Sequence, residues 1–559
     1  MSRVYEIASD YVDRYAALDP LAATSMGVPG HDAEMTDYSP AGANARAQLS
    51  RETLARLGPA PLEGERDRIA RDVMVERLEL ELELHEAGEH LRNLNVIASP
   101  VQRIRSNFDL MPRTTAEDWH NIAVRMGKVP EGVNGLCAGL SAGLAEGLPA
   151  AKRQVIACIR QAETWSGAQA GAPSFFATLL DSYDQGGGGD SVLRGDLERA
   201  AAVAAQGYAD LRRYLEEQYL PRASERDAVG RDRYALRARV FNGLTLDLEE
   251  TYAWGWEEVR RIEEAMAETA GQVVTDGGVR AAIDRLERDP KRVIEGAEPF
   301  RRWMQELQDK TIAELDGVHF DIPEPVKRLE AMIAPPGGAL AMYYTGPSED
   351  FSRPGRTWYP TDGRARFPLW QEMSVAYHEG VPGHHLQIAQ ARYLGETLSR
   401  YQRLLAGTSG YVEGWALYAE RLMADLGYLD DPGFYLGFLS SQALRAARVV
   451  VDIGLHLELE IPEREAFHGG EPWQPELALA FLLQHSFYPE EMLRSEVDRY
   501  LGWPGQAISY KVGERVWLQA REDARRRHGN AFDLKAFHAQ ALNLGPMSLA
   551  QLQRELAAL

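Results

Sequence analysis

The spacing of apolar side chains constrains the fold of this chain more than any other feature. In residues 67–87, for example, Ile69, Val73 and Leu80 keep the three- and four-residue steps that place side chains on one face of an α-helix. The segment Leu78–Leu84 alternates leucine and glutamate as a strand would, but both residues are good helix formers and the flanking residues keep helical phase. The segment is therefore predicted to be helical.

The same helical pattern fills most of the sequence. It recurs in residues 115–124, 151–165 and 193–222, and it returns after residue 420. We therefore expect a mostly α protein with a large, two-lobed helical fold around a central cleft. We expect an N-terminal helical lobe at 1–245 and a catalytic lobe at 246–559, with the two lobes packed as one unit.

One region departs from the helical pattern. Residues from about 318 to 365 are rich in aromatic and β-branched side chains, and they contain the turn-forming run Pro335–Gly338. A small β-sheet is expected here, directly before the histidine-rich segment described below. The edge of such a sheet is a surface on which an extended peptide can pair.

Composition narrows the classes of function. The formal net charge of -22 and the isoelectric point near 5.2 oppose binding to nucleic acid or to an anionic membrane. The two cysteines, Cys137 and Cys158, form no metal or redox motif. The first residues show no apolar core of a signal peptide, so we expect a cytoplasmic protein, monomeric or homodimeric.

A cluster of histidines carries the main chemical signal. His378 is followed directly by Glu379, and His384 and His385 follow within seven residues. Two histidines four residues apart on a helix, with a glutamate beside the first, form a common zinc-hydrolase motif. Here the position four after His378 is Pro382, which cannot continue the helical hydrogen bonds. The helix must bulge or break at this point.

The break leaves two candidates for the second ligand. In an ideal helix His384 would lie about 120° from the face of His378, but a bulge can return it to the metal. His385 would share the face of His378, about 10 Å further along the helix. We favour His384 and treat His385 as a residue that contacts a ligand or the substrate.

A zinc site with two histidines needs a third protein ligand to leave one position for water. Glu413 is the best candidate, because the residues between it and the histidines can form a helix and a return turn. Glu420 lies seven residues further on and shares its helical face, which suggests a supporting role. One zinc ion is expected.

These segments also resemble a known family. The runs His378–Gln387 and Glu413–Glu420 are similar to those of the bacterial family labelled domain of unknown function 885. The similarity extends through four more segments: Arg445–His456, Arg499–Tyr500, Pro504–Lys511 and Phe537–His538. More distantly, that family resembles helical zinc peptidases of the thimet oligopeptidase, carboxypeptidase Taq and angiotensin-converting enzyme groups. The resemblance implies that Gly383-His384 matches the Gly-His of their motif and that Glu413 takes the place of their third ligand.

The resemblance also implies a peptidase mechanism. Glu379 would activate a metal-bound water, and a tyrosine or histidine of the C-terminal half would stabilise the oxyanion. Tyr510 is the first candidate for that role, with Tyr500 and His538 as alternates.

Several other polar residues are candidates for supporting roles. Asp452 could orient a ligand histidine or form an ion pair with Arg445 or Arg448. Arginines could bind the terminal carboxylate of a peptide, and the candidates are Arg353, Arg356, Arg445 and Arg499.

The leading hypothesis is a zinc-dependent hydrolase that cleaves short peptides. A zinc amidase of non-peptide amides is the alternative among enzymes. A metal-stabilised binding protein without catalysis is the alternative among other classes. Glu379 distinguishes them, because a purely structural site does not need a carboxylate beside its ligand.

Overall fold

The computed structural model describes residues 2–169, 172–334, 342–361 and 363–558. Over these residues the backbone is mostly α-helical, with short strands in two small sheets, which confirms the prediction of a mostly α protein with a small sheet. No described helix combines the length and the apolar character needed to cross a lipid bilayer. The predicted turn at Pro335–Gly338 lies outside the described residues.

The chain divides into two compact units. The first comprises Met1–Asp227 with Leu501–Trp503, and the second comprises Ala228–Tyr500 with Pro504–Leu559. The division falls after Asp227, whereas the sequence analysis placed its boundary between residues 245 and 246.

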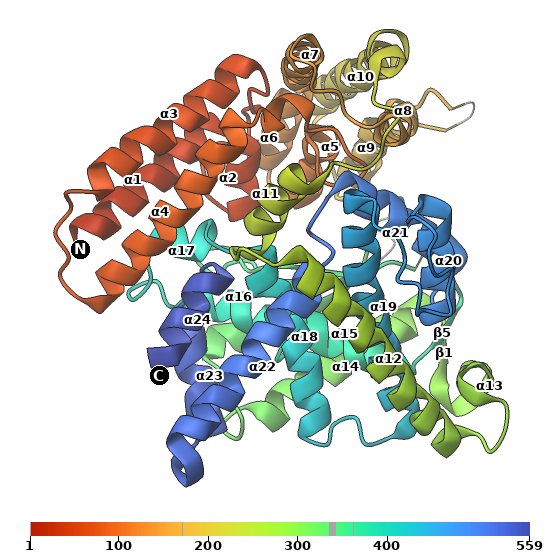
Figure 1. Cartoon of the computed structure of the whole chain (residues 1–559). Coiled ribbons are helices and arrows are strands. Elements are labelled where there is room, and N and C mark those ends of the chain that lie inside the picture. Colours follow the sequence, from red (N-terminus) through yellow and green to blue (C-terminus); the bar gives the residue numbers. More distant parts are fainter. Residues whose placement is uncertain (1, 170–171, 335–341, 362, 559) are drawn as a thin grey trace. The chain divides into compact units, whose positions relative to one another are not determined.

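The first unit is helical (Figure 1). Its α-helices are α1 (Arg3–Leu18), α2 (Pro20–Met26), α3 (Pro40–Leu57), α4 (Glu65–Glu86), α5 (Pro100–Leu110), α6 (Ala116–Gly127), α7 (Val129–Ala145), α8 (Lys152–Ser166), α9 (Phe175–Gln185) and α10 (Ser191–Tyr214). Helices α1, α3 and α4 pack together, and α10 packs against α6, α7, α8 and α9. The helical prediction for Leu78–Leu84 is confirmed, because this segment lies inside α4.

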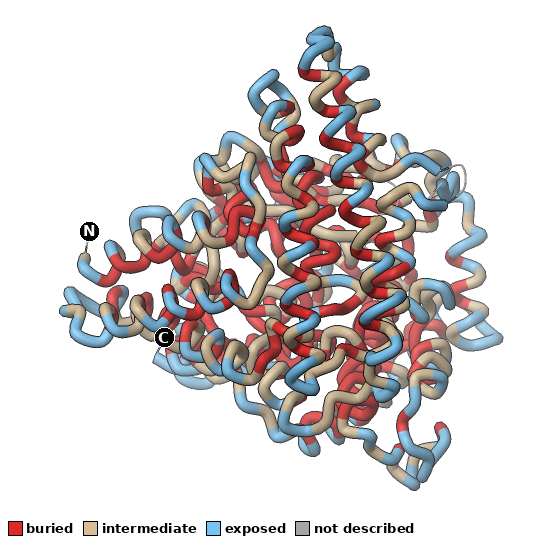
Figure 2. Tube along the Cα trace, turned by 90° about the horizontal axis from the view of Figure 1, so that it is seen from above, coloured by how far each residue is buried: buried red, intermediate tan, exposed pale blue. Residues whose placement is uncertain are grey.

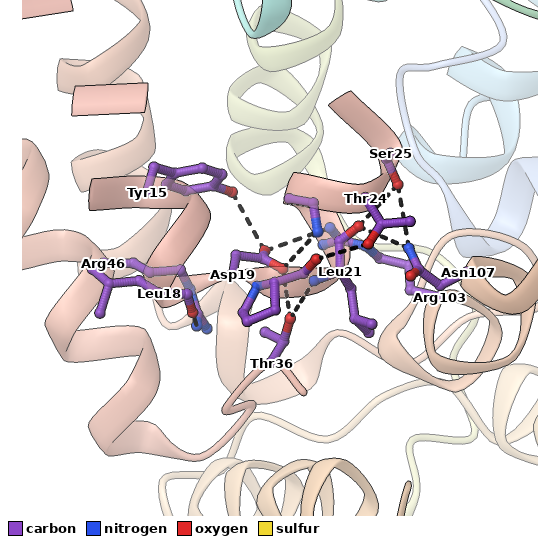
Figure 3. Close-up of polar contacts among 12 residues, drawn as sticks. Tyr15, Leu18, Asp19, Leu21, Thr24, Ser25, Thr36, Arg46, Arg103 and Asn107 are labelled. Atoms are coloured by element: carbon purple, nitrogen blue, oxygen red, sulfur yellow. Dashed lines mark hydrogen bonds and ion pairs between the residues drawn. The ribbon is translucent and has the colours of Figure 1, made fainter. Parts of the chain in front are cut away.

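A buried polar network fixes the start of α2 (Figure 3). Asp19 accepts hydrogen bonds from the Thr36 hydroxyl at 2.6 Å and from the Ala22 backbone N–H at 3.0 Å. Arg103 lies 3.5 Å from the same carboxylate. Burial alone would raise the pKa of Asp19, but Arg103 and these hydrogen bonds lower it, so the carboxylate stays charged and caps the helix.

The second unit contains the remaining helices and the strands (Figure 1). Its helices are α11 (Arg231–Asn242), α12 (Leu248–Val273), α13 (Gly278–Arg288), α14 (Ala297–Leu315), α15 (Glu372–Glu379), α16 (His384–Tyr393), α17 (Arg400–Leu404), α18 (Ser409–Asp425), α19 (Pro432–Leu457), α20 (Pro475–His485), α21 (Glu490–Gly502), α22 (Ser509–His528), α23 (Leu534–Asn543) and α24 (Leu549–Ala558). The last residues of α21 group with the first unit.

Helix α19 lies at the centre of the second unit. Every residue from Leu436 to His456 is buried, and α19 packs against α12, α15, α20 and α22. Most other helices instead alternate buried and exposed residues along their length (Figure 2). A helix buried all round is normally apolar, yet α19 carries Arg445, Arg448 and Asp452. Buried charged groups of this kind need partners, and those partners lead to the candidate site.

The predicted small sheet is present. Strand β4 (Gly355–Tyr359) lies between β2 (Leu329–Ile333), which is parallel to it, and β3 (Tyr343–Thr345), which is antiparallel. A second sheet pairs β1 (Val293–Glu295) with β5 (Arg366–Pro368). A core cluster that includes Phe300, Tyr359, Phe367 and Ala376 joins α14, both sheets and α15.

Candidate metal centre

The break predicted in the histidine segment is present. Helix α15 ends at Glu379 and α16 begins at His384, with Pro382 in the connection between them. The backbone N–H of Gly383 donates to the carbonyl of Tyr377 at 3.0 Å. A Cβ at Gly383 would lie only 2.0 Å from the carbonyl oxygen of His378, so this close approach requires glycine. The break turns the chain back so that the first residue of α16 faces the last turn of α15.

Three side chains from α15, α16 and α18 converge at this break. Oε2 of Glu413 lies 3.4 Å from Nε2 of His378 and 3.4 Å from Nε2 of His384. The three potential ligand atoms all lie within 4.8 Å of one another. In a tetrahedral zinc site with bonds of about 2.0–2.1 Å, neighbouring ligand atoms are roughly 3.3–3.4 Å apart. The two measured separations match the edges of such a site, so these residues fit a zinc ion.

The electrostatics of the three residues also suit a cation. Burial alone would raise the pKa of Glu413, but His384 and His378 hold it well below its usual value, so the carboxylate stays ionised. Burial alone would lower the pKa of His378, but the carboxylates of Glu413 and Glu420 raise it to about 9. The side chain of Glu413 keeps 19% of its surface exposed, whereas its Oε2 atom and both histidines are buried.

His385 is placed differently from His384. Its Nε2–H donates to the carbonyl of Val326 at 2.6 Å, and its Nδ1 accepts a hydrogen bond from the Tyr344 hydroxyl at 2.9 Å. Burial lowers the pKa of His385 to about 4, which keeps the ring neutral. Both of its nitrogens are used in these two hydrogen bonds. Nδ1 of His384, by contrast, is buried without a hydrogen-bond partner among the described residues. The geometry therefore favours His384 over His385 as the ligand.

Glu420 supports the first histidine. Nδ1 of His378 donates to Oε1 of Glu420 at 2.7 Å, and Ser374 donates to the other carboxylate oxygen. Arg445 lies 3.7 Å from Oε1. Burial alone would raise the pKa of Glu420, but Arg445 and His378 lower it. An ionised carboxylate on Nδ1 fixes the tautomer that leaves the Nε2 lone pair free for a metal.

Glu379 is buried next to the three residues. Burial raises its pKa above the usual value; His384 and His378 oppose this shift, and Glu413 adds to it. A carboxylate whose pKa is moved toward neutrality is suited to accept a proton and release it again within one reaction cycle.

Of the three candidates for oxyanion stabilisation, Tyr510 lies nearest to the histidines. Its ring stacks on that of His378, with 6.3 Å between centroids and 18° between planes. Burial, with a contribution from Glu413, raises the pKa of Tyr510, so the phenol stays protonated and can donate a hydrogen bond. The hydroxyl of Tyr500 is instead bonded to Arg448 at 2.9 Å and to Glu496 at 2.8 Å.

His538 packs among aromatic residues. Its Nε2 lies 2.6 Å from the Tyr418 hydroxyl, and its ring stacks on Phe320. Burial lowers the pKa of His538 to about 3, so its ring is uncharged near neutral pH. It also packs edge-on against Trp415, whose indole N–H donates to the carbonyl of Pro382 at 2.8 Å. His538 therefore contacts the break through Trp415.

Asp452 has neither of the partners expected for it. Its carboxylate accepts hydrogen bonds from the Tyr234 hydroxyl at 2.7 Å and from the Gly505 backbone N–H at 2.9 Å. Among the described residues, its hydrogen bonds therefore go to α11 and to the segment before α22, and not to the ligand histidines. Glu420, from α18, has the orienting role considered for it.

The candidate carboxylate-binding arginines differ in how fully they are paired. Arg356 pairs with Glu330 across the sheet at 2.8 Å, and Arg353 donates to the carbonyl of Gly346. Arg499 directs all three guanidinium nitrogens to partners, two to Glu496 and one to Gln506.

Comparison with known proteins places the chain in a family. A profile of the bacterial proteins of unknown function called DUF885 matches residues 20–556. The chain belongs to this family. No curated protein matches the sequence significantly.

Solved structures show the same fold as this DUF885 chain. A presumed lipoprotein from Colwellia psychrerythraea is 24% identical, with 100% of this chain and 99% of that chain covered and a TM-score of 0.85. A presumed lipoprotein of unknown function from Shewanella oneidensis is 17% identical, with both chains covered completely and a TM-score of 0.73. At these identities the likeness establishes the architecture alone.

Sequence reasoning missed three residues of this DUF885 site. Ser374 lies one turn before His378, a helical spacing that could have indicated its contact with Glu420. Trp415 follows the ligand candidate Glu413 by two residues, but nothing local indicates that its indole reaches Pro382. Tyr488 lies in the loop before α21, where burial raises its pKa and its surroundings include Ser441, Arg445 and Glu420. No periodic pattern marks a loop tyrosine of this kind.

Proposed function

We propose that this protein is a zinc-dependent hydrolase that cleaves peptide bonds of short peptides. The observation that carries the proposal is the pair of 3.4 Å separations from Glu413 to His378 and His384, with Glu379 beside them. The metal, when bound, supplies a Lewis acid that polarises the carbonyl and makes water more acidic. His378, His384 and Glu413 would hold it.

The side chains account for the other steps of the reaction. Glu379 takes a proton from the water that attacks the carbonyl carbon, and it returns that proton to the nitrogen of the leaving amine as the C–N bond breaks. The Tyr510 hydroxyl donates a hydrogen bond to the developing oxyanion. Glu420 holds His378 in place throughout.

The first experiment is a metal analysis of the purified protein. The second is mass spectrometry of the products from a mixed peptide library, with and without chelator. We expect one zinc ion per chain and cleavage that stops on chelation and resumes with added zinc. Cleavage of non-peptide amides alone would favour the amidase alternative. Metal without any hydrolysis would favour a binding protein.

The substitution Glu379→Gln tests the role of the carboxylate. We expect retained zinc and a loss of turnover of roughly 10²- to 10⁴-fold, the usual contribution of a general base. Glu372→Gln is the matched control, because Glu372 is a buried acid on the same helix whose pKa is raised by burial and modulated by Arg364 rather than by the histidines. Full activity of the Glu379→Gln variant would exclude the mechanism.

For the location we propose the cytoplasm, because Cys137 and Cys158 are both free thiols, as is usual in reducing compartments. The names of the two structural neighbours support the cell envelope as the alternative. Fractionation of cells that express the natural gene would decide between them.

A further inference from the structure

Three buried arginines gather near the histidines. Arg445 and Arg448 from α19 and Arg499 from α21 lie beside the carboxylates of Glu420 and Glu496. The three guanidinium groups thus share two carboxylates as ion-pair partners, and both carboxylates also have other hydrogen-bond partners or more than one arginine. Glu420 holds His378, and Glu496 accepts hydrogen bonds from both Arg448 and Arg499.

Two of these arginines have buried nitrogens without a hydrogen-bond partner among the described residues. They are Nη1 of Arg448 and Nε of Arg445, in residues that are 6% and 9% exposed. The other two nitrogens of Arg448 bind Tyr500 and Glu496, so Nη1 is the one left for a ligand. An unsatisfied buried donor on a charged group is costly, and an incoming anion would relieve that cost.

These nitrogens lie close to the proposed zinc site. The guanidinium carbon of Arg448 is 4.7 Å from the ring centroid of Tyr510, and the ring of His378 stacks on the same tyrosine. Arg445 is 5.7 Å from the same centroid. Tyr510 and Tyr488, which lie beside these arginines, are themselves only partly buried. Tyr510 therefore contacts both of these arginines and one of the proposed zinc ligands.

We infer that Arg445 and Arg448 form a subsite for the terminal carboxylate of the substrate. Guanidinium groups bind carboxylates through short, charge-assisted hydrogen bonds, often two at once. Because one residue of an extended peptide spans about 3.3–3.6 Å, a carboxylate held beside Tyr510 places the first or second peptide bond from the C-terminus near the histidines. The inference rests on the proposed hydrolase function and specifies it as removal of one or two C-terminal residues.

The direct test compares N-acetylated tetrapeptides that end in a free carboxylate with the same peptides ending in an amide. We expect kcat/KM of the wild-type protein to be roughly 10- to 100-fold higher for the free acids, the gain typical of hydrogen bonds to a charged group. The difference should lie mainly in KM, and the products should be one or two C-terminal residues. Equal rates for acid and amide, or release from the N-terminus, would overturn the subsite while leaving the proposed function intact.

The substitution Arg448→Lys tests the residue itself. Lysine keeps the positive charge beside Glu496 but lacks the third nitrogen, so the ratio of acid to amide should fall toward one. Arg499→Lys is the matched control, because Arg499 pairs with the same Glu496 and its nitrogens are all engaged within the protein. That variant should keep the wild-type ratio. An unchanged ratio of acid to amide kcat/KM in the Arg448→Lys variant would contradict the assignment of Arg448 to the carboxylate subsite.

A binding measurement separates the subsite from the hydrolase function. Calorimetric titration of the zinc-loaded protein with N-acetylated dipeptides should show tighter binding of the free acid than of the amide. If no peptide is cleaved but the acid binds preferentially, the hydrolase proposal fails and the subsite stands. If acid and amide bind equally, the subsite is excluded.

Discussion

At the scale of single residues, the two nitrogens of His378 define the site. Each faces a carboxylate, Glu413 at Nε2 and Glu420 at Nδ1. The two glutamates can reach the same imidazole because they lie seven residues apart on one face of α18. Their surroundings assign them different roles. Glu413 is partly exposed beside His384, whereas Glu420 is fully buried between Ser374 and Arg445.

The substitution Glu420→Gln should weaken zinc binding by about 10- to 100-fold, because the ring of His378 loses the charged partner that orients it. Competition with a chromophoric chelator measures the affinity. Asp452→Asn is the control, since Asp452 is equally buried but bonded to Tyr234 and Gly505. Wild-type affinity in the Glu420→Gln variant would show that Glu420 does not act through His378.

At the scale of elements, the crossing of α18 and α22 sets the geometry of the site. Gly414 follows Glu413, and a Cβ added to it would lie 2.4 Å from the Cα of Gly513. The two helices therefore touch through their backbones at this point. Helix α22 carries Tyr510 in its first turn, so the glycine contact fixes the spacing between Glu413 and Tyr510.

Gly414→Ala should force α18 and α22 apart and reduce the free energy of unfolding by about 1–3 kcal/mol, the usual cost of overpacking. It should also weaken zinc binding, because Glu413 moves with the helix. Gly271→Ala on α12 is the control: its added methyl would meet nothing within 4 Å, so a neutral or slightly stabilising effect is expected. Denaturant titration measures the free energy of unfolding of both variants. Unchanged stability of Gly414→Ala would contradict the close crossing.

At the scale of the whole molecule, buried carboxyl groups make the stability depend on pH. Burial raises the pKa of Glu81, Glu372 and Asp452 to about 7. Such groups bind protons more tightly when folded, so the stability they contribute is complete below their unfolded values and is lost as pH rises through 7. The stability that Glu258 contributes depends on pH in the opposite direction. Burial would raise its pKa, but Arg261 and Lys511 lower it to about 2, so its contribution is lost as pH falls toward 2.

The stability contributed by these three raised carboxyl groups is therefore expected to fall between pH 5 and pH 8. Asp452→Asn should flatten that fall, since the uncharged amide has no proton to lose. The pKa shift of about three units limits the effect to on the order of 4 kcal/mol. Melting temperatures of both proteins across this range, in the same buffers, give the comparison. An equally steep fall in the variant would show that Asp452 does not titrate in this window.

Local sequence patterns predicted much of this structure. The helical class follows from apolar spacing, as the helical segment Leu78–Leu84 within α4 illustrates. The break between His378 and His384 follows from Pro382, whose ring and missing N–H cannot fit a helix interior. These features depend on backbone dihedrals and on neighbours a few residues away, so the sequence contains the necessary information.

The tertiary structure decided which groups meet. His384 and His385 are adjacent and chemically identical, and only contacts with the remote residues Val326 and Tyr344 commit His385 elsewhere. In the same way, Glu420 rather than Asp452 orients His378 because of how α18 packs against α15. By itself the sequence determined the helices, the break and the types of residue at the candidate site. The ligand geometry and the partners of the buried arginines were set by packing, because hydrogen-bond partners that are distant in sequence are chosen only when the helices come together.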